Sequence, residues 1–474
     1  MIADLKPYAE YKESGLAWLG QMPGHWSLVP NRGLVRKRKV LVGNRHGDYR
    51  LLSLTKQGVI VRDISTGKGK FSSDMGTSQE VRSGDLVFCL FDVPETPRTV
   101  GLSQHDGMIT GAYTVFESLG RGSAEYFELF YRAMDDRKLL SPLYSGLRNT
   151  IPPERFLGTK SPLPPSAEQA AIVRFLDWAN GRLERAIRAK RKVIALLGEQ
   201  KQTIIYRAVT RGLDPSVPLK PSGIPWLGDI PQHWELWRIS RFARVGNGST
   251  PSRGQPNYWN GGSYPWLNSS QINRGYIDSA DQFVTPTALR ECHLPKVPAG
   301  SVLVAITGQG KTRGMCAVLG IEATINQHIA YIAPHASVAS PEFIRLALTG
   351  AYPQLRAISD DSGSTKGALT CQDLKRFRLA FPPREEQDVL LKRIQTETAE
   401  LNTAISRLER EIELLREYRT RLVADVVTGK LDVREASLHL PDELGDGMDE
   451  GDGLIEAEDV AIEDLDALPE EAEE

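Results

Sequence analysis

The chain has 474 residues, of which 41% are hydrophobic and 25% charged, the ordinary balance of a globular protein with room for several domains. No apolar run approaches the ~20 residues that cross a bilayer, and the first residues lack the apolar core of a signal peptide. The cysteines Cys89, Cys292, Cys316 and Cys371 lie far apart, without a zinc-type or disulfide-type spacing. We therefore expect a soluble, cytoplasmic protein.

The net charge of −2 conceals an uneven distribution of charge along the chain. Residues 441–474 contain 16 acidic residues and no Lys or Arg, so residues 1–440 hold all 58 basic residues against 44 acidic ones, a net charge of +14. A basic body of this kind suits a phosphate-binding surface, because each Lys or Arg placed on a phosphate releases condensed counterions. A mildly basic solvated surface is the alternative.

A repeated motif opens the chain and organises it. Residues 14–26 (SGLAWLGQMPGHW) return as residues 222–234 (SGIPWLGDIPQHW), at an offset of 208. Residues 164–169 (PPSAEQ) return as residues 382–387 (PPREEQ), at an offset of 218. Repeats at constant offsets over such distances predict two copies of one unit. Each unit contains a globular stretch followed by a long helix.

The first globular stretch, residues 28–163, follows the N-terminal motif segment 1–27. It contains β-like runs and one short helical pattern bounded by Gly and Pro; they lie at residues 49–54, 59–61, 85–91, 113–116 and 126–135. Basic and amide side chains in its loops are candidates for DNA contacts, because Arg and Lys suit guanine and phosphate while Asn suits adenine. These candidates are Lys68, Lys70, Arg98, Arg148 and Asn149. A solvated turn is the alternative for each loop.

Two long helices are predicted, a central one at 164–212 and a C-terminal one at 382–432. A Pro-Pro pair fixes φ at each entrance, and an acidic residue follows in the first turn, where the helix dipole favours it. Their apolar residues recur in steps of three and four, which predicts a coiled coil; they are Leu183, Ile187, Ile194, Leu197 and Ile204 in the first helix and Leu401, Ile405, Leu408, Ile412, Leu415 and Leu422 in the second. Two separate amphipathic helices, each covering its own domain, are the alternative.

A pseudo-two-fold relation between the two units requires these helices to run antiparallel. The seam from Leu183 to Ala208 would rise about 38 Å, close to the ~34 Å of one turn of B-DNA. Two domains held that far apart would reach two segments of one duplex.

The second globular stretch, residues 236–381, follows a linker at 213–235 that carries the second motif copy. Strands are expected at residues 301–307, 316–319 and 328–332, and a helix at 341–349. Its polar, Gly-containing loops provide the second set of DNA candidates. These are Ser249, Thr250, Arg253, Gln271, Asn273, Thr307, Gln309, Lys311, Thr312, Arg313, Ser364, Thr365 and Lys366. The two globular stretches share little similarity, so we expect an α+β protein with two mixed α/β domains that differ.

The sequence offers no catalytic motif that we recognise. Gly310-Lys311-Thr312 has the end of a phosphate-binding loop, but Ala305 stands where that loop requires glycine. Methyltransferase tetrapeptides, HExxH and GxSxG are absent, and the repeated His25 and His233 are expected to satisfy core hydrogen bonds. We expect no catalytic residue, no metal site and no bound cofactor.

The acidic C-terminal region, residues 433–474, is expected to be largely disordered. Residues 441–474 lack aromatic residues and positive charge, a composition that disfavours independent folding. Such a tail would compete with DNA phosphates for basic surface and lower nonspecific binding. The alternatives are a passive solubility tail and a short amphipathic segment formed by Ile455, Val460, Leu465 and Leu468.

The paired motifs resemble one family. The elements at 14–26 and 222–234, the helix entries at 164–169 and 382–387, and the stretch 248–326 are similar to segments of Type I restriction–modification specificity subunits. The resemblance covers residues ~14–432 and does not extend to the acidic tail.

The resemblance implies two target-recognition domains, at 28–163 and 236–381, each reading half of a split target in double-stranded DNA. The helices would fix the spacer length and dock two methyltransferase subunits, which restriction subunits join. S-adenosylmethionine, ATP and magnesium would belong to those partners. A coiled-coil scaffold that does not read DNA, or a DNA-modifying enzyme with an unrecognised catalytic module, are the alternatives.

Overall fold

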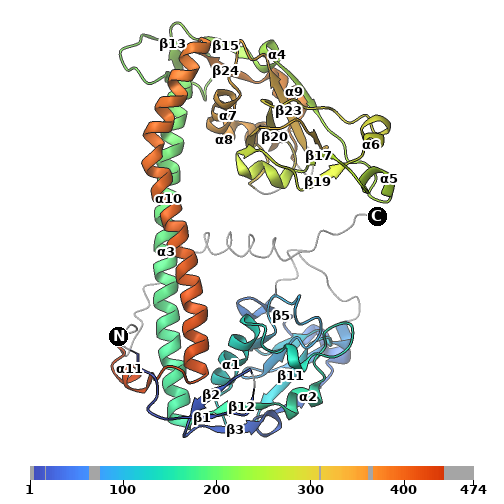
Figure 1. The fold of residues 1–474 in the computed structure, drawn as a ribbon, viewed down its shortest axis with the longest axis vertical. Helices are drawn as coiled ribbons and strands as arrows, with labels where there is room; N and C mark the ends of the chain where they lie inside the picture. The colour runs from blue at the N-terminus through green and yellow to red at the C-terminus, as the bar shows by residue number, and fades with distance from the viewer. Residues whose placement is uncertain (1–4, 17, 63–74, 309–310, 361–366, 442–474) are drawn as a thin grey trace. The chain divides into compact units, whose positions relative to one another are not determined.

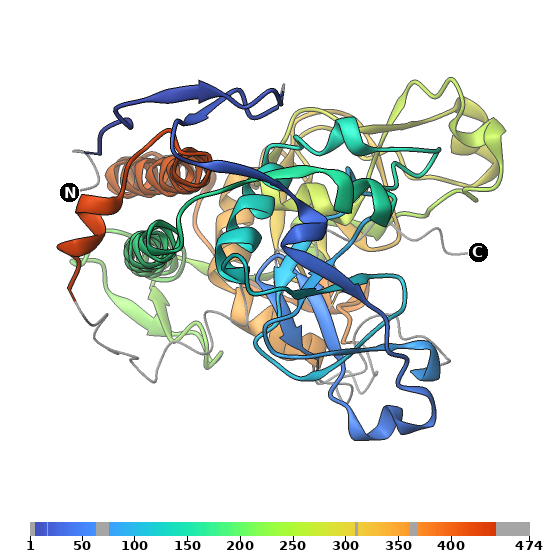
Figure 2. The ribbon, with the colours of Figure 1, turned by 90° about the horizontal axis from the view of Figure 1, so that it is seen from below.

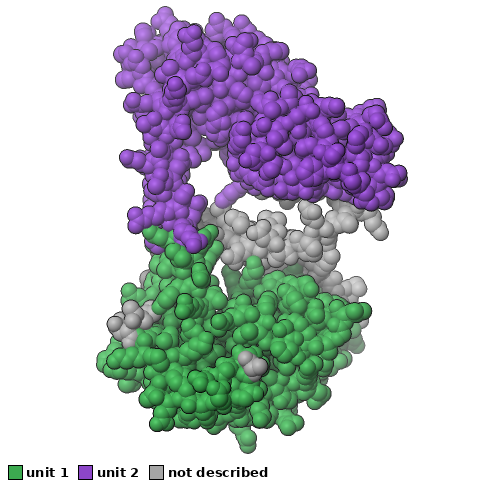
Figure 3. Space-filling view, in the orientation of Figure 1, with its two compact units in different colours: residues 1–189, 411–474 green, residues 190–410 purple. Residues whose placement is uncertain are grey.

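The computed structural model describes residues 5–16, 18–62, 75–308, 311–360 and 367–441. The chain divides into two compact units (Figure 3): unit 1 holds residues 1–189 and 411–474, and unit 2 holds residues 190–410. Both divisions fall inside the two long helices, α3 (Ser166–Arg211) and α10 (Arg384–Val427). Each unit therefore contains the beginning of one long helix and the end of the other. The acidic tail beyond residue 441 lies outside the described residues.

In unit 1, five antiparallel pairings build the frame and the sheet of the globular part. β1 (Tyr11–Glu13) pairs with β2 (Gln21–Pro23), so the first motif copy provides the connection and the second strand of a hairpin. β3 (Ser27–Pro30) pairs with β12 (Lys160–Leu163) and thereby joins the two ends of the inserted stretch. Within that stretch, four antiparallel strands form a sheet in the order β4-β11-β8-β9. They are β4 (Val35–Arg38), β11 (Thr114–Ser118), β8 (Leu86–Phe88) and β9 (Val100–Leu102).

Smaller elements complete unit 1. Two further hairpin-like pairs lie beside the sheet, β5 (Leu52–Thr55) with β6 (Gly58–Val61), and β7 (Gln79–Val81) with β10 (Gly107–Ile109). The helices are α1 (Ala124–Asp136), α2 (Pro153–Gly158), α11 (Arg434–Leu438) and the 3₁₀ turns Asn31–Gly33, Gly43–Asp48, Met75–Thr77 and Ser141–Leu143. α1 begins at Ser123, whose hydroxyl accepts a hydrogen bond from the Tyr126 backbone N–H, a normal N-cap. Aromatic side chains of α1 and α2 pack on the sheet, with Tyr131 and Phe156 fully buried.

Unit 2 repeats the frame around a different sheet. β13 (Leu219–Pro221) pairs with β14 (Asp229–Pro231), and β15 (Glu235–Arg238) pairs with β24 (Arg378–Phe381). A five-stranded sheet follows the order β16-β23-β20-β21-β18, and a three-stranded sheet the order β19-β17-β22. Their strands are β16 (Ala243–Asn247), β17 (Tyr264–Leu267), β18 (Tyr276–Ile277), β19 (Gln282–Val284), β20 (Val302–Ala305), β21 (Cys316–Leu319), β22 (Thr324–Ile325) and β23 (Ile329–Pro334).

Unlike the unit 1 sheet, both sheets of unit 2 contain a parallel pair, β18 with β21 and β17 with β22. Strands β20 and β21 are buried along their whole length, as apolar runs covered on both faces should be. The helices are α4 (Ile239–Phe242), α5 (Pro256–Trp259), α6 (Pro286–Glu291), α7 (Pro341–Gly350), α8 (Tyr352–Asp360), α9 (Cys371–Arg376) and a 3₁₀ turn at Ser269–Arg274. The two globular parts are therefore different mixed α/β structures on similar frames.

The long helices pack against one another within each unit. In unit 1, Ile172 and Phe175 of α3 share a buried cluster with Leu422 and Val426 of α10. In unit 2, Ile205 of α3 lies in a cluster with residues of α10 that include Leu390. The start of one helix thus meets the end of the other, and Figure 2, which looks along them, shows α3 beside α10.

The eleven predicted seam residues are all buried or half-buried, while coiled-coil packing itself stays a prediction. Near the end of α3 the fully buried positions are Ile205, Ala208 and Val209 rather than Ile204. They face the globular part of unit 2, so tertiary contacts replace the heptad spacing there.

The segments around Lys6 and around Asp432 meet in unit 1. The Asp432 backbone N–H donates to the Lys6 carbonyl at 2.8 Å, and the Tyr11 hydroxyl donates to the Lys430 carbonyl at 3.2 Å. By the repeat offsets of 208 and 218, Lys6 and Asp432 both correspond to Asp214, which in unit 2 lies within one continuous segment of chain. Unit 1 is thus assembled from two segments at the position where unit 2 is covalently continuous.

Candidate nucleic-acid interface

The repeated motifs meet at a buried carboxylate in unit 1. Glu168, in the first turn of α3, accepts hydrogen bonds from the Trp26 indole Nε1 at 2.9 Å and the Tyr8 hydroxyl at 2.6 Å. The His25 Nε2 lies 2.7 Å from its other oxygen. Burial and the neighbouring carboxylate raise the pKa of the Tyr8 hydroxyl, so it remains a donor. This glutamate clamp joins the His-Trp motif to the start of the long helix.

The same clamp occurs in unit 2 with one donor fewer. Glu386, in the first turn of α10, accepts from the Trp234 indole Nε1 at 2.9 Å, and the His233 Nε2 lies 2.8 Å from its second oxygen. Position 216, which corresponds to Tyr8, is Ser216. The Glu386 side chain is 30% exposed, against 4% for Glu168. Both repeated histidines therefore have a structural partner, as expected, but their side chains are 40% and 47% exposed and do not lie in the core.

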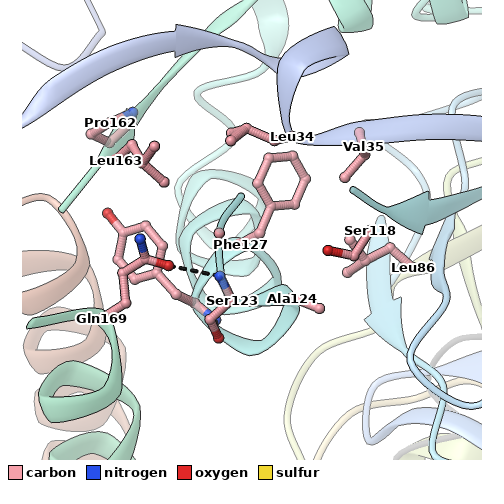
Figure 4. A pocket seen from close by; sticks show the side chains of 12 residues that line it. Leu34, Val35, Leu86, Ser118, Ser123, Ala124, Phe127, Pro162, Leu163 and Gln169 are labelled. Carbon is pink, nitrogen blue, oxygen red and sulfur yellow. Dashed lines mark hydrogen bonds between the residues drawn. The ribbon is translucent and has the colours of Figure 1, made fainter. Parts of the chain in front are cut away.

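The glutamine that follows each glutamate holds the globular part. Gln169 Oε1 accepts from the Ser123 backbone N–H at 2.7 Å, and its Nε2 donates to the Pro164 carbonyl at 2.7 Å. Figure 4 shows the first of these bonds, from the start of α1 to α3. Gln387 repeats it, accepting from the Ser340 backbone N–H at 2.8 Å. Ser123 and Ser340 are the N-cap residues of α1 and α7, so each glutamine fixes the first turn of a domain helix.

The space beside the Gln169 clamp is packed rather than open. Leu34, Phe127 and Leu163 are among the residues that line a cavity of about 10 Å³ (Figure 4), which has room for a single water at most. The glutamine clamp is therefore a packed joint and not a ligand site.

A glycine completes each clamp at the end of the opposite helix. Gly429 follows α10 at φ +77°, and a Cβ there would lie 3.0 Å from the Trp26 ring and 2.3 Å from Pro23. Gly212 follows α3 at φ +69°, and a Cβ there would lie 3.6 Å from the Trp234 ring, an ordinary contact distance. A left-handed residue that ends a helix against a tryptophan requires glycine.

In unit 1 the two arginines among the predicted DNA-contact residues are engaged in ion pairs. Arg98 Nη1 lies 2.8 Å from Asp136 Oδ1, and Arg148 pairs with Asp92, whose pKa this arginine lowers. Asn149 is half-buried and adopts a positive φ of 42°. Lys68 and Lys70 lie outside the described residues. These interactions are compatible with DNA contact, although both arginines already pair with an aspartate.

Several predicted residues of unit 2 come together at one sheet edge. Thr250 donates to Gln327 Oε1 at 2.5 Å, and Thr307 Oγ1 lies 2.7 Å from His328 Nδ1. Ser249 is held beside them, because its backbone N–H donates to the Ile325 carbonyl at 3.0 Å. Lys311 is exposed and Thr312 half-buried in the loop that follows β20.

Two predicted contacts of unit 2 are corrected by the structure. Arg313 is 4% exposed, and its guanidinium donates to the Gly367 carbonyl at 2.5 Å and pairs with Asp360. Gln271 is likewise 4% exposed and donates to Asp281 at 2.8 Å. Both side chains bind the protein itself, so neither is retained as a DNA contact.

The remaining candidates of unit 2 are dispersed. The Arg253 guanidinium lies over Trp259, 3.9 Å from the ring centroid, and donates to Gln282 at 2.7 Å. Asn273 is exposed. Gln309, Ser364, Thr365 and Lys366 lie outside the described residues.

The sequence analysis did not include two groups of residues among the candidate DNA contacts. The first is Asn326-Gln327-His328, whose signal was a polar triplet between two strands. The second is the basic run Arg36–Lys39 on and after the edge strand β4; Lys37 and Lys39 are exposed, whereas Arg38 lies 3.0 Å from Asp85. Four consecutive basic residues could have been found in the sequence.

The described residues include no group of three or more His, Cys, Asp or Glu side chains placed to hold a metal ion. Burial raises the pKa of the Cys316 thiol to about 12, which leaves it unreactive. A search of the described helices finds none with the length and hydropathy that crossing a bilayer requires.

Known proteins share sequence and fold with this chain. Residues 231–414 match the family model described as the Type I restriction modification DNA specificity domain. The Escherichia coli EcoR124I/EcoR124II specificity subunit is 24% identical over 302 residues, which cover 59% of this chain and 68% of the relative. The Methanocaldococcus jannaschii MjaIX specificity subunit is 30% identical over 193 residues, 40% of this chain and 42% of the relative.

Two further matches span most of the chain. The Escherichia coli K12 EcoKI specificity subunit is 21% identical over 87% of this chain and 90% of its own length. A solved structure from work on complex assembly in the Type I restriction–modification system is similar in fold, with a TM-score of 0.57 at 15% identity over 86% of this chain and 99% of that one. By sequence, this chain is similar to specificity subunits of Type I restriction–modification systems, and it shares the fold of the solved structure.

Proposed function

We propose that the chain reads a split target in double-stranded DNA through two separate recognition domains, residues 28–163 and 236–381. As a specificity subunit it recognises DNA sequence and leaves the chemistry to partner subunits. It would direct methyltransferase and restriction subunits to the site that it reads.

One observation carries this proposal: the two frames are alike and the two sheets are not. Both frames contain the glutamate and glutamine clamps, at Glu168–Gln169 and at Glu386–Gln387. The frames hold an antiparallel four-stranded sheet in unit 1 and sheets with parallel pairs in unit 2. A shared mount with unlike inserts suits the recognition of two unlike half-sites. The net charge of +14 on residues 1–440 provides the attraction to phosphates.

The long helices support a role in setting the spacer. α3 contains 46 residues and α10 contains 44, and each continues from one unit into the other. At ~1.5 Å per residue, each is roughly 65–70 Å long. We propose that these uninterrupted helices fix the spacing between the two half-sites and provide the surface to which methyltransferase subunits bind.

Exposed apolar residues on the helices support that docking. Leu196 on α3 is 56% exposed and Leu414 on α10 is 48% exposed. They stand at equivalent positions of the repeat, 218 residues apart. Exposed leucines at equivalent positions of the two helices suit two copies of one partner.

A domain exchange tests the proposal. Residues 236–381 are replaced by the corresponding domain of a relative, and the target is determined by selection from a randomised duplex pool with methyltransferase subunits present. One half-site should change while the other half-site and the spacer remain. If both halves changed together, the two domains would not read independently, and if no split motif were enriched by either protein, the chain would be a scaffold that does not read sequence.

A further inference from the structure

Three loops of unit 2 lie at the same end of the five-stranded sheet: one follows β16, one follows β20 and one precedes β23. β16 and β20 flank β23 and run antiparallel to it, so both end where β23 begins. The paired strands β20 and β23 are labelled in Figure 1. Asn247 and Ala305, the last residues of β16 and β20, pair with Ala330 and Ile329, the first residues of β23. Thr250, Thr307 and the turn that contains Gln327 are therefore brought together by strand pairing.

The backbone of this edge is tightly held. The Ser249 N–H donates to the Ile325 carbonyl at 3.0 Å, and the Ile306 N–H donates to the His328 carbonyl at 2.9 Å. A Cβ at Gly248 would lie 1.7 Å from the Ile325 carbonyl oxygen, so only glycine permits this approach. The position of Gln327 is consequently set by the sheet.

Side chains along this edge form a continuous hydrogen-bonded chain. Thr250 Oγ1 lies 2.5 Å from Gln327 Oε1, Gln327 Nε2 lies 3.0 Å from His328 Nε2, and His328 Nδ1 lies 2.7 Å from Thr307 Oγ1. The Gln327 side chain is exposed, whereas His328 and Thr307 are half-buried. The amide is thus fixed on two sides and open to solvent on the rest.

The donors and acceptors of this hydrogen-bonded series leave one N–H and one oxygen lone pair of the Gln327 amide unused. With the Thr250 hydroxyl as donor to Oε1, Nε2 donates to His328 Nε2, and the imidazole Nδ1–H donates to Thr307. With the amide turned over, every bond reverses and the chain is equally satisfied. In both cases the amide retains one unused N–H and one unused oxygen lone pair.

One N–H beside one acceptor is the pair that reads adenine in the major groove. The Gln oxygen accepts from adenine N6 and the Gln nitrogen donates to adenine N7. We propose that Gln327 is a specificity-determining residue that reads an adenine in the half-site recognised by unit 2, and that Thr250 and His328 are positioning residues that hold its amide. This inference rests on the proposed function, because it names the base that one domain would read.

Three variants of the full chain test it, with methyltransferase subunits present and a pool of random duplexes as the probe. Gln327→Leu removes both polar groups at similar size, Gln327→Glu keeps only acceptors, and Thr250→Val removes one positioning bond. Gln104→Leu, at an exposed glutamine of unit 1, is the matched control.

The expected result is confined to one base pair of one half-site. Gln327→Leu should reduce discrimination for adenine there by about 5- to 150-fold, the change that corresponds to ~1–3 kcal/mol for a bidentate contact. Gln327→Glu should shift the preference towards cytosine, whose N4 donates to a carboxylate. Thr250→Val should weaken the same position less. The half-site read by unit 1 should still be enriched by each variant, which shows that the variant is folded.

Several outcomes would overturn the inference. An unchanged motif with Gln327→Leu would remove Gln327 from base reading, and an equal effect of Gln104→Leu would show that the loss is not specific. If Gln327→Leu abolished all enrichment, the base preferences of Gln327→Glu and Thr250→Val would decide whether Gln327 reads the base. An unaltered base preference in both variants would refute the inference. A wild-type chain that enriched no split motif would instead refute the proposed function.

Discussion

Trp26 and Trp234, 208 residues apart in the sequence, each place an indole N–H 2.9 Å from a glutamate in the first turn of a long helix. The two acceptors differ in burial, since Glu168 is 4% exposed and Glu386 is 30% exposed. Loss of one donor costs more free energy at a buried carboxylate than at one that water can reach in the donor's place.

Trp26→Phe should therefore destabilise the protein more than Trp234→Phe. We expect the first change to lower the free energy of unfolding by about 2–3 kcal/mol and the second by about 1 kcal/mol. Hydrogen exchange measured separately in the two units provides the readout. Trp237→Phe is the control, because Trp237 donates only to the nearby exposed Glu235. Equal losses in all three variants would show that ring size, not the hydrogen bond, matters.

Replacing the clamp glutamines should loosen the domain helices that they hold. Gln387→Ala leaves the Ser340 N–H without its acceptor, and Gln169→Ala does the same to Ser123. We expect faster amide exchange in the first turn of α7 or α1 respectively, at a cost of ~1–3 kcal/mol. Glu385→Ala, at an exposed position beside Gln387, should leave both turns unchanged. Identical protection in the Gln387 variant would contradict the clamp.

Two neighbouring basic residues of unit 2 should behave differently. Arg313→Ala removes a buried guanidinium from Asp360 and the Gly367 carbonyl, so the thermal midpoint should fall by the equivalent of ~1–3 kcal/mol. Lys311→Ala, at an exposed position, should leave the midpoint unchanged and weaken DNA binding, with a salt slope smaller by about 1. Unaltered DNA affinity and salt dependence in Lys311→Ala would remove this loop from the interface.

Lengthening the helices should change the spacer. An insertion of four residues after Leu197 adds roughly one turn to α3, and a matching insertion after Leu415 adds one to α10. Together they should lengthen the tolerated spacer while both half-sites remain the same. Selection from a duplex pool with variable spacers measures it. The same spacer at the same affinity would show that the helices do not determine spacing.

A charge on either exposed leucine should weaken partner binding. Leu196→Glu and Leu414→Glu should each remove one methyltransferase subunit, and the double variant both, because the two residues occupy equivalent repeat positions. Native mass spectrometry of the assembled complex counts the subunits. Leu438→Glu, at a residue that is 77% exposed on the short helix α11, is the control. Full assembly of the double variant would place the docking surface elsewhere.

Features with a local signal could be predicted from the sequence. The Pro-Pro entries and the three-four spacing of apolar residues predicted the long helices, and the run at 316–319 coincides with β21. Hydrogen bonds between distant residues could not be predicted, since Trp26 and Glu168 are 142 residues apart and Thr250 and Gln327 are 77 apart. Arg313 was wrongly assigned to DNA because its partner Asp360 is 47 residues away and its burial depends on both. Composition identifies residues that could bind DNA, but the fold determines which of them are already used.

The contact between Lys6 and Asp432 has a consequence for synthesis on the ribosome. The buried cluster of unit 1 joins residues near the N-terminus, such as Trp26, to Leu422 and Val433 of the last helical region. Unit 2, residues 190–410, is continuous and is complete before those residues emerge. At ~5–20 residues per second, unit 1 would wait roughly 12–50 s for its missing part. The domain translated first therefore becomes complete last, and until then its unfinished core requires protection from aggregation.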